Sequence, residues 1–255
     1  MFELASTPRE LGEILVQGLR LGRLAFRRLF MLTSLLAFLA LIPTVSLVWG
    51  AGDATIAMGS IDELVQRFRG PYGVAIVVIM VLGLPFQALL LSRIAAASRG
   101  RTEGMQEEWR AALRAWPWMF VAMVVYALAV LLGLVLLIVP GLILAISLMF
   151  AQFSVVLEGR GPIQALNRSH NLVWGYWWRT FGLLLLMFVP LWLVVAIASG
   201  IMGIDTGNST DMTVTGRGLF EQGVVQMVFY ALCSPFVYSV LYVYYHDLKL
   251  RKQDG

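Results

Sequence analysis

The chain alternates long apolar stretches with short charged segments. Five stretches contain no Asp, Glu, Lys or Arg, and they cover residues 29–52, 70–92, 115–157, 180–204 and 222–245. An ionised side chain in the middle of a bilayer costs roughly 2.5 to 3.5 kcal/mol, so these stretches are candidate membrane spans. A bilayer core about 30 Å thick takes about 20 helical residues. Four stretches therefore fit one span each, whereas residues 115–157 fit two, with a turn expected between Gly133 and Gly141.

This pattern predicts an all-α fold, a polytopic membrane helical bundle that forms a single membrane domain over residues 1–255. Six transmembrane helices are expected, at residues 29–49, 71–92, 117–138, 141–157, 180–201 and 223–245. Residues 115–157 are also compatible with a re-entrant hairpin, because either form returns the chain to the side from which it came.

A basic amphipathic segment precedes each pair of spans, and we expect three interfacial helices, at residues 8–28, 103–116 and 162–178. In the first, Thr7 and Glu10 have the spacing of a capping box, with Pro8 at the first helical position. Apolar residues then recur at roughly helical spacing in each segment, which is typical of helices that lie in a membrane interface. The recurrence predicts three similar units, although basic loops with Trp are general in membrane proteins.

The charged residues indicate how the chain crosses the membrane. With the N-terminus inside, 16 of the 19 basic residues fall in inner segments, whereas the outer loops hold three basic and six acidic residues, a net charge of 3 − 6 = −3. Basic residues favour the cytoplasmic side, so both ends of the chain are expected in the cytoplasm. The pI of about 9.5 then needs no nucleic-acid partner, because anionic lipid headgroups attract basic segments.

The composition offers little material for catalysis. Of the residues, 59% are apolar and 13% charged, with two histidines and one cysteine, too few of the usual ligands for a zinc site. Neighbouring residues on a helix diverge by about 100°, so Ser169, His170 and Asn171 do not converge as nucleophile, base and orienting group. The chain contains no phosphate-binding loop and no nucleophile elbow. We therefore expect no enzyme activity, no metal and no cofactor.

Uncharged polar residues and prolines stand inside the spans. The polar ones predict either hydrogen bonds between helices, worth about 0.6 kcal/mol each, or a polar path across the bundle. A proline in a helix frees a carbonyl group, so the prolines predict kinks or broken helices. The candidates for these intramembrane roles are Gln87, Gln152, Gln226, Pro85, Pro140, Pro190 and Pro235.

Glu158 ends the fourth predicted span at the point where a carboxylate would leave the bilayer. Gly159 and Gly161 follow it and allow a sharp change of direction, and a helix is expected to begin near Pro162. Arg168 is then within reach of Glu158 or of the inner end of a neighbouring span. The alternative is that both side chains simply meet lipid headgroups.

Three segments carry a family resemblance. From Glu158 the sequence reads E-G-R-G-P-I-Q-A-L-N-R-S-H-N-L-V-W-G-Y-W-W-R, the chain closes with L-Y-V-Y-Y-H-D-L-K-L-R-K, and I-V-P-G begins at Ile138. Together they resemble the YciC-like bacterial inner-membrane proteins and the related membrane domain of some glycerophosphoryl diester phosphodiesterases. The resemblance implies a six-span bundle in a bacterial cytoplasmic membrane, with no established reaction, since the phosphodiesterase barrel is absent. The sequence departs from the family pattern at His170.

These observations predict a non-enzymatic, multi-pass inner-membrane protein that interacts with lipids or with other membrane proteins, including copies of itself. The expected partners are anionic headgroups on the cytoplasmic side. One alternative is a channel or facilitator for a small or apolar solute, and a second is a lipid-headgroup enzyme with Glu158 and Asp247 as acid and base. The candidate structural or lipid-interface residues are Glu158, Arg168, Trp174, Trp177, Trp178, Arg27, Arg28, Arg110, Arg114, Asp247 and Arg251.

Overall fold

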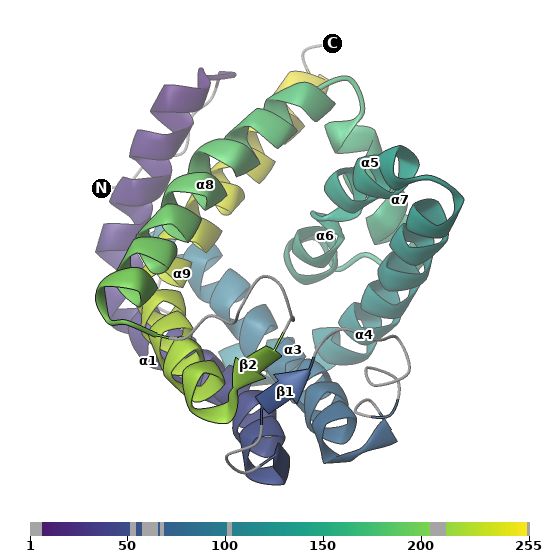
Figure 1. The fold of residues 1–255 in the computed structure, drawn as a ribbon. Helices are drawn as coiled ribbons and strands as arrows, with labels where there is room; N and C mark the ends of the chain where they lie inside the picture. Colours follow the sequence, from purple (N-terminus) through teal and green to yellow (C-terminus); the bar gives the residue numbers. More distant parts are fainter. Residues whose placement is uncertain are drawn as a thin grey trace. The chain divides into compact units, whose positions relative to one another are not determined.

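The computed structural model describes residues 7–51, 55–57, 66, 69–100, 104–204 and 213–253. The elements in chain order are α1 (Leu11–Ala51), β1 (Thr55–Ala57), α3 (Pro71–Ser98), α4 (Met105–Leu136), α5 (Ile138–Leu148), α6 (Ala151–Glu158), α7 (Pro162–Val173), α8 (Trp177–Ile201), β2 (Thr213–Thr215) and α9 (Gly216–Gln253) (Figure 1). Residues 52–54, 58–65, 67–68 and 205–212, in the two predicted outer loops, lie outside the described residues.

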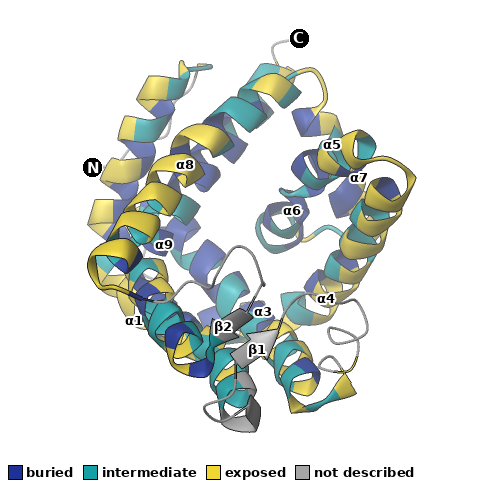
Figure 2. Cartoon of the chain, viewed as in Figure 1, coloured by how far each residue is buried: buried dark blue, intermediate teal, exposed yellow. Residues whose placement is uncertain are grey.

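The predicted fold class is confirmed, because the described chain is an all-α helical bundle. Six of its helical segments are long and apolar enough to cross a membrane, so this is a multi-pass membrane protein. Many large apolar side chains are exposed along α4 and α8 (Figure 2), among them Val135, Leu136 and Trp192, as expected of surfaces that face lipid. The strands β1 and β2 form only a three-residue antiparallel ladder with Thr55 opposite Thr215.

Contacts divide the chain into two compact units, where the sequence predicted a single membrane domain. Unit 1 comprises Met1–Leu29, Leu84–Met187 and Pro235–Gly255, and unit 2 comprises Phe30–Gly83 and Phe188–Ser234. Unit 1 thus brings together both end segments and the middle of the chain. It also contains all of the predicted lipid-interface residues.

Within unit 1, α4 and α5 form a tight hairpin. The helices are separated by one residue, Leu137, whose backbone is extended (φ −161°, ψ 142°). A Cβ atom placed on Gly133 would lie 2.8 Å from the Cα atom of Gly141, so this close approach requires glycine. The Tyr126 hydroxyl also donates to the Ala145 carbonyl across the hairpin, at 3.3 Å. The predicted turn between Gly133 and Gly141 is confirmed.

The predicted fourth span, residues 141–157, is interrupted where α5 ends and α6 begins. The hydroxyl of Ser169, on α7, inserts at this break. It accepts the backbone N–H of Phe150 at 3.1 Å and donates to the carbonyl of Ser147 at 2.7 Å. Buried backbone groups need hydrogen-bond partners, and Ser169 supplies a partner to two of them at the break between α5 and α6. Ser169 therefore has a structural role that the sequence did not reveal.

The predicted boundaries of the interfacial helices are wrong at three places. Helices α1 and α4 are continuous, so neither residues 8–28 nor residues 103–116 form a separate helix. The sequence has no glycine between residues 23 and 49, and Pro117 lies within the continuous α4. The third segment ends early, at Val173, because Trp174 is extended and Gly175 has a φ of +94°. Trp177 and Trp178 consequently begin α8.

The first part of α1 packs on α9 within unit 1. Four residues of its apolar stripe are buried, namely Ile14, Leu21, Ala25 and Leu29. A Cβ atom on Gly18 would lie 2.5 Å from the Cα atom of Val240, and one on Gly22 would lie 2.8 Å from the Phe236 ring. Small residues four apart let two membrane helices approach closely. Protein rather than lipid therefore covers the stripe that was predicted to lie in the interface.

The prolines do not break their helices. Pro85, Pro190 and Pro235 lie inside the continuous helices α3, α8 and α9, so the predicted breaks are wrong there. Pro140 stands in the first turn of α5, where a missing N–H is well tolerated. In unit 2, the Thr33 hydroxyl donates to the Ala231 carbonyl at 3.0 Å. This is the carbonyl that Pro235, four residues later, leaves without its helical donor.

Candidate functional site

Four tyrosines on α9 connect this helix to three other helices of unit 1. Tyr238 receives a hydrogen bond from Gln87, and Tyr242, Tyr244 and Tyr245 pair through their hydroxyls with Ser98, Thr180 and Ser154, at distances of 2.9 to 3.2 Å. The partners lie on α3, α6 and α8. Gln87 thus makes an interhelical hydrogen bond, which is one of the two roles predicted for the uncharged polar residues in the spans. The tyrosines therefore connect α9 to these helices in a polar region that also contains the part-buried Glu158 and the buried Asp247.

The first carboxylate belongs to Glu158 at the end of α6. We use the name Glu158 cluster for Glu158, Arg160, Arg168, Tyr245 and Lys249. The Oε1 atom of Glu158 accepts hydrogen bonds from the Tyr245 hydroxyl at 2.7 Å and from Lys249 Nζ at 2.9 Å. Its Oε2 atom accepts from Arg160 Nε at 2.7 Å and lies 3.6 Å from Arg168 Nε. The predicted contact between Glu158 and Arg168 is confirmed.

Local backbone chemistry explains how these residues meet. Gly159 has a φ of +64° and terminates α6 in the left-handed conformation that glycine adopts most readily. Its N–H and that of Arg160 return to the carbonyls of Val155 and Ser154. Pro162 then starts α7, which brings Arg168 back to Glu158. The turn predicted from Gly159, Gly161 and Pro162 is therefore present.

The second carboxylate belongs to Asp247 on α9. We use the name Asp247 cluster for Asp247, Arg9, Arg179 and Arg251. The backbone N–H of Arg9 donates to Oδ1 at 2.8 Å, and Arg251 Nε donates to Oδ2 at 2.8 Å, with Arg179 3.5 Å away. Both Arg179 and Arg251 also donate to the Arg9 carbonyl. The Asp247 cluster therefore fixes the segment before α1 to α8 and α9.

Aromatic residues lie on and next to the helices α7 and α8, which also carry Arg168 and Arg179. Trp174 and Trp178 are among the most exposed large residues of unit 1, at 58% and 78%. His170 stacks on Trp174 with 5.1 Å between ring centroids, and Trp177 stacks on Phe181. Arg251 and Lys252 lie over the ring of Tyr176, in the geometry of cation–π contacts. Exposed tryptophans beside basic residues are typical of a membrane interface.

The remaining predicted basic residues lie on the surface of unit 1. Arg27 and Arg28 are exposed on α1, and Arg110 and Arg114 are exposed on α4. Arg93 of α3 connects the two helices, because it forms an ion pair with Glu108 of α4 at 2.8 Å and donates to the Arg28 carbonyl. The structure therefore separates these four arginines from the two carboxylate clusters.

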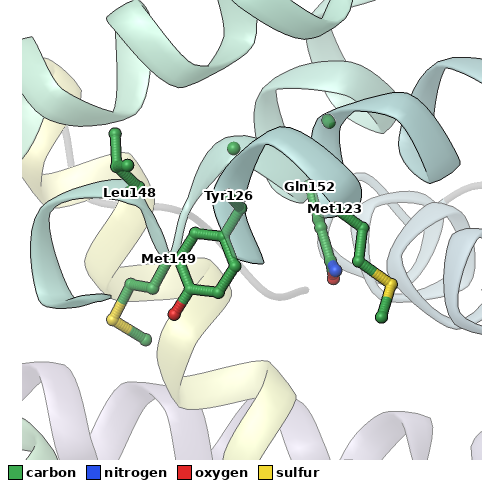
Figure 3. Close-up of a pocket in the computed structure, with 7 residues that line it drawn as sticks. Met123, Tyr126, Leu148, Met149 and Gln152 are labelled. Atoms are coloured by element: carbon green, nitrogen blue, oxygen red, sulfur yellow. The ribbon is translucent and has the colours of Figure 1, made fainter. Parts of the chain in front are cut away.

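Gln152 and Gln226 line small cavities instead of joining the clusters. In unit 1, a cavity of about 160 Å³ lies at the break between α5 and α6, lined by Tyr126, Met149 and Gln152 among others (Figure 3). In unit 2, one of about 170 Å³ lies between α1 and α9, lined by Thr44, Gln226 and Tyr230 among others. Both are mostly apolar, and each contains one amide side chain.

The sequence did not indicate several residues of the clusters. Tyr245, Lys249 and Arg160 were not paired with Glu158, and the main chain of Arg9 was not paired with Asp247. One signal was present: Tyr238, Tyr242 and Tyr245 follow at spacings of four and three, which places them on one face of a helix. The backbone contacts of Arg9 carry no such signal in the sequence.

The fold and the clusters define a multi-pass helical membrane protein with a basic region built around the part-buried Glu158 and the buried Asp247. A family model described as "Domain of unknown function (DUF7847)" matches residues 111–248, which is more than half of the chain, so the chain belongs to this family. The matched residues include Glu158, Arg168 and Asp247. No curated protein and no solved structure matches the chain significantly.

Proposed function

We propose that this chain is a non-enzymatic membrane protein whose basic region binds anionic lipid headgroups. The observation that carries the proposal is the charge balance of the two clusters. Glu158 and Asp247 supply two negative charges, whereas Arg160, Arg168, Lys249, Arg9, Arg179 and Arg251 supply six positive ones. Excess positive charge beside a membrane attracts anionic lipid, by about 1 kcal/mol for each basic residue near the surface.

The surroundings of the clusters support a lipid partner rather than a soluble one. The exposed Trp174 lies directly after α7 and the exposed Trp178 lies in the first turn of α8, and such aromatic rings settle at the headgroup level. Arg27, Arg28, Arg110 and Arg114 add exposed positive charge on α1 and α4. The distribution of basic residues in the sequence supports a cytoplasmic position for this region, and the resemblance to YciC-like proteins supports a bacterial inner membrane.

The environment of the carboxylates favours binding over catalysis. A general acid or base needs access to the reacting group and a proton that it can exchange. Both oxygens of Glu158 are held by Tyr245, Lys249 and Arg160, and both oxygens of Asp247 are held by Arg9 and Arg251. Carboxylates held in this way supply structure and charge balance to the basic region.

Native mass spectrometry from lipid nanodiscs tests the proposal. With equal amounts of phosphatidylglycerol and phosphatidylcholine in the disc, the protein is expected to retain phosphatidylglycerol preferentially. Replacing Arg27, Arg28, Arg110 and Arg114 by Gln should reduce this preference, whereas Arg217→Gln should leave it unchanged. Arg217 is a matched control because it is 87% exposed and belongs to unit 2. Equal retention of the two lipids by the unaltered protein would contradict the proposal.

A second candidate function, a facilitator for a small or apolar solute, is favoured by one observation. The cavity in unit 1 lies at an interrupted helix and contains the Gln152 amide, and interrupted membrane helices often line substrate sites. A liposome flux assay separates the two functions. Selective solute flux that Gln152→Leu reduces would favour the facilitator, and the absence of flux would favour the lipid-binding protein.

A further inference from the structure

The Glu158 cluster has more hydrogen-bond donors than its carboxylate can accept. Two arginines and one lysine present many N–H groups, yet their only side-chain hydrogen bonds among the described residues are those from Arg160 Nε and Lys249 Nζ to Glu158. Arg168 Nε is buried and lacks a hydrogen-bond partner in the part of the chain that the structure describes. A buried donor without an acceptor is costly, so the cluster has unused donor capacity that an additional acceptor would satisfy.

The exposure of the side chains shows from where such an acceptor can approach. The Glu158 side chain is only 12% exposed, whereas Arg160, Arg168 and Lys249 are 41%, 28% and 31% exposed. The cations are therefore accessible while the carboxylate lies beneath them. Their combined charge with Glu158 is 3 − 1 = +2, which matches a group that carries up to two negative charges.

We infer that Arg160, Arg168 and Lys249 form a binding site for a phosphate group, and that the Glu158 carboxylate occupies this site when no phosphate is bound. A phosphate offers several strong acceptor oxygens, and a guanidinium group can bind a phosphate with two parallel hydrogen bonds, that is, in a bidentate geometry. The phosphate belongs either to a lipid headgroup or to a soluble phosphate ester. This inference rests on the proposed function, because it names the chemical group that the basic region recognises.

The proposed role of Glu158 predicts that removing its carboxylate raises the affinity for phosphate. A carboxylate that shares its cations with the ligand competes with it, so removing the carboxylate strengthens binding. Glu158→Gln is therefore expected to bind phosphate about tenfold more tightly, whereas Arg168→Gln binds it about tenfold more weakly, given the strength of charge-assisted hydrogen bonds. A residue with a purely structural role would weaken binding in both variants.

Isothermal titration calorimetry on the full chain in phosphatidylcholine nanodiscs tests the inference. The probes are short-chain phosphatidic acid, glycerol 3-phosphate and inorganic phosphate. Binding of phosphatidic acid alone would identify the lipid headgroup as the source, and comparable binding of glycerol 3-phosphate would identify a soluble ester. Glu221→Gln, at an exposed ion pair of unit 2, is the control and should bind as the unaltered protein does.

Thermal unfolding of the same samples gives a second readout. Ligands that bind the folded state stabilise it, so phosphatidic acid should raise the melting temperature of Glu158→Gln more than that of the unaltered protein. If Glu158→Gln does not fold, Arg160→Gln replaces it, because Arg160 is the most exposed cation of the cluster. Arg160→Gln should bind each probe several-fold more weakly.

The results distinguish this inference from the proposed function. Undiminished affinity in Arg168→Gln and Arg160→Gln, or no gain in a folded Glu158→Gln, overturns the phosphate site. If the nanodisc experiment still shows retention of phosphatidylglycerol, the proposed function stands without this site. If the unaltered protein shows no lipid preference and binds only soluble phosphate, the proposed function fails and the site remains.

Discussion

The Glu158 and Asp247 clusters use the same chemistry with different outcomes. In the Asp247 cluster, two arginines share one carboxylate and also donate to the Arg9 carbonyl. The backbone therefore accepts hydrogen bonds from these arginines in addition to those that the carboxylate accepts. In the Glu158 cluster, two arginines and a lysine meet a single carboxylate, and no described backbone carbonyl accepts from these cations. The Asp247 cluster therefore has a backbone acceptor for its arginines, although Arg179 Nε is buried without a hydrogen-bond partner among the described residues. In the described part of the chain, the cations of the Glu158 cluster have only the Glu158 carboxylate as an acceptor.

The difference follows from where the partners come from. Asp247 lies on one side of α9 and binds the segment before α1, whose backbone supplies both a donor and an acceptor. Lys249, two residues later on the same helix, points about 200° away around the axis and meets the turn between α6 and α7. The end of α6 supplies the carboxylate, the turn supplies Arg160, and α7 supplies Arg168. The comparison therefore assigns a mainly structural role to Asp247 and a mainly binding role to the Glu158 cluster.

The largest effect is expected from Asp247→Asn. This variant leaves Arg179 and Arg251 without their counter-charge at a side chain that is only 5% exposed. Removing one partner from a buried ion pair costs about 3–5 kcal/mol, and we expect a loss of that size in the free energy of unfolding. Chemical or thermal denaturation in detergent measures it. Glu221→Gln is the control, because exposed pairs contribute about 0–1 kcal/mol, and equal losses in both variants would contradict the structural role.

A smaller effect is expected from Gly18→Val, a substitution that should disturb only one of the two clusters. The new side chain would collide with the backbone of Val240 and push α1 away from α9, and overpacking of this kind costs about 1–3 kcal/mol. The displacement should release Arg9 from Asp247 and leave the Glu158 cluster, which contains no residue of α1, in place. Gly12→Val is the control, because open space surrounds Gly12. An equal loss in both variants would show that the close approach of α1 and α9 is unimportant.

The third effect concerns Glu158 and Arg168, whose pair is partly exposed. Glu158→Gln and Arg168→Gln are each expected to lower thermal stability in detergent, and the double variant should be no worse than either single variant. Contacting charged residues show coupling energies of about 0.5–3 kcal/mol in such cycles. Strictly additive losses would mean that the two side chains do not interact.

The outline of the fold was predictable because charges are costly in a bilayer. The uncharged stretches predicted the six spans, and the positions of Gly133 and Gly141 predicted the hairpin turn. The continuity of α1 was not predictable, because a basic amphipathic segment such as residues 11–28 has the same pattern whether it lies on lipid or packs on α9. Gly18 and Gly22 decide between these cases, and their partners are more than 200 residues away in the sequence.

The candidate site was predictable only where its partners are close in the sequence. Glu158 and Arg168 lie ten residues apart around a turn marked by Gly159 and Pro162, so their contact followed from helix geometry. Lys249 joins them from α9, and Ser169 meets residues about 20 positions earlier across a break that no proline or glycine announces. Such contacts depend on tertiary packing, which local pattern does not contain.

Photochemical cross-linking tests the contrast between the clusters most directly. A phosphatidic acid analogue with a photoreactive headgroup is added to the full chain in nanodiscs, and the cross-linked residues are mapped by peptide mass spectrometry. We predict cross-links in residues 158–170 and at Lys249, and a loss of those cross-links in Arg168→Gln. Cross-links centred on Arg9 and Arg179, with residues 158–170 unlabelled, would contradict the account.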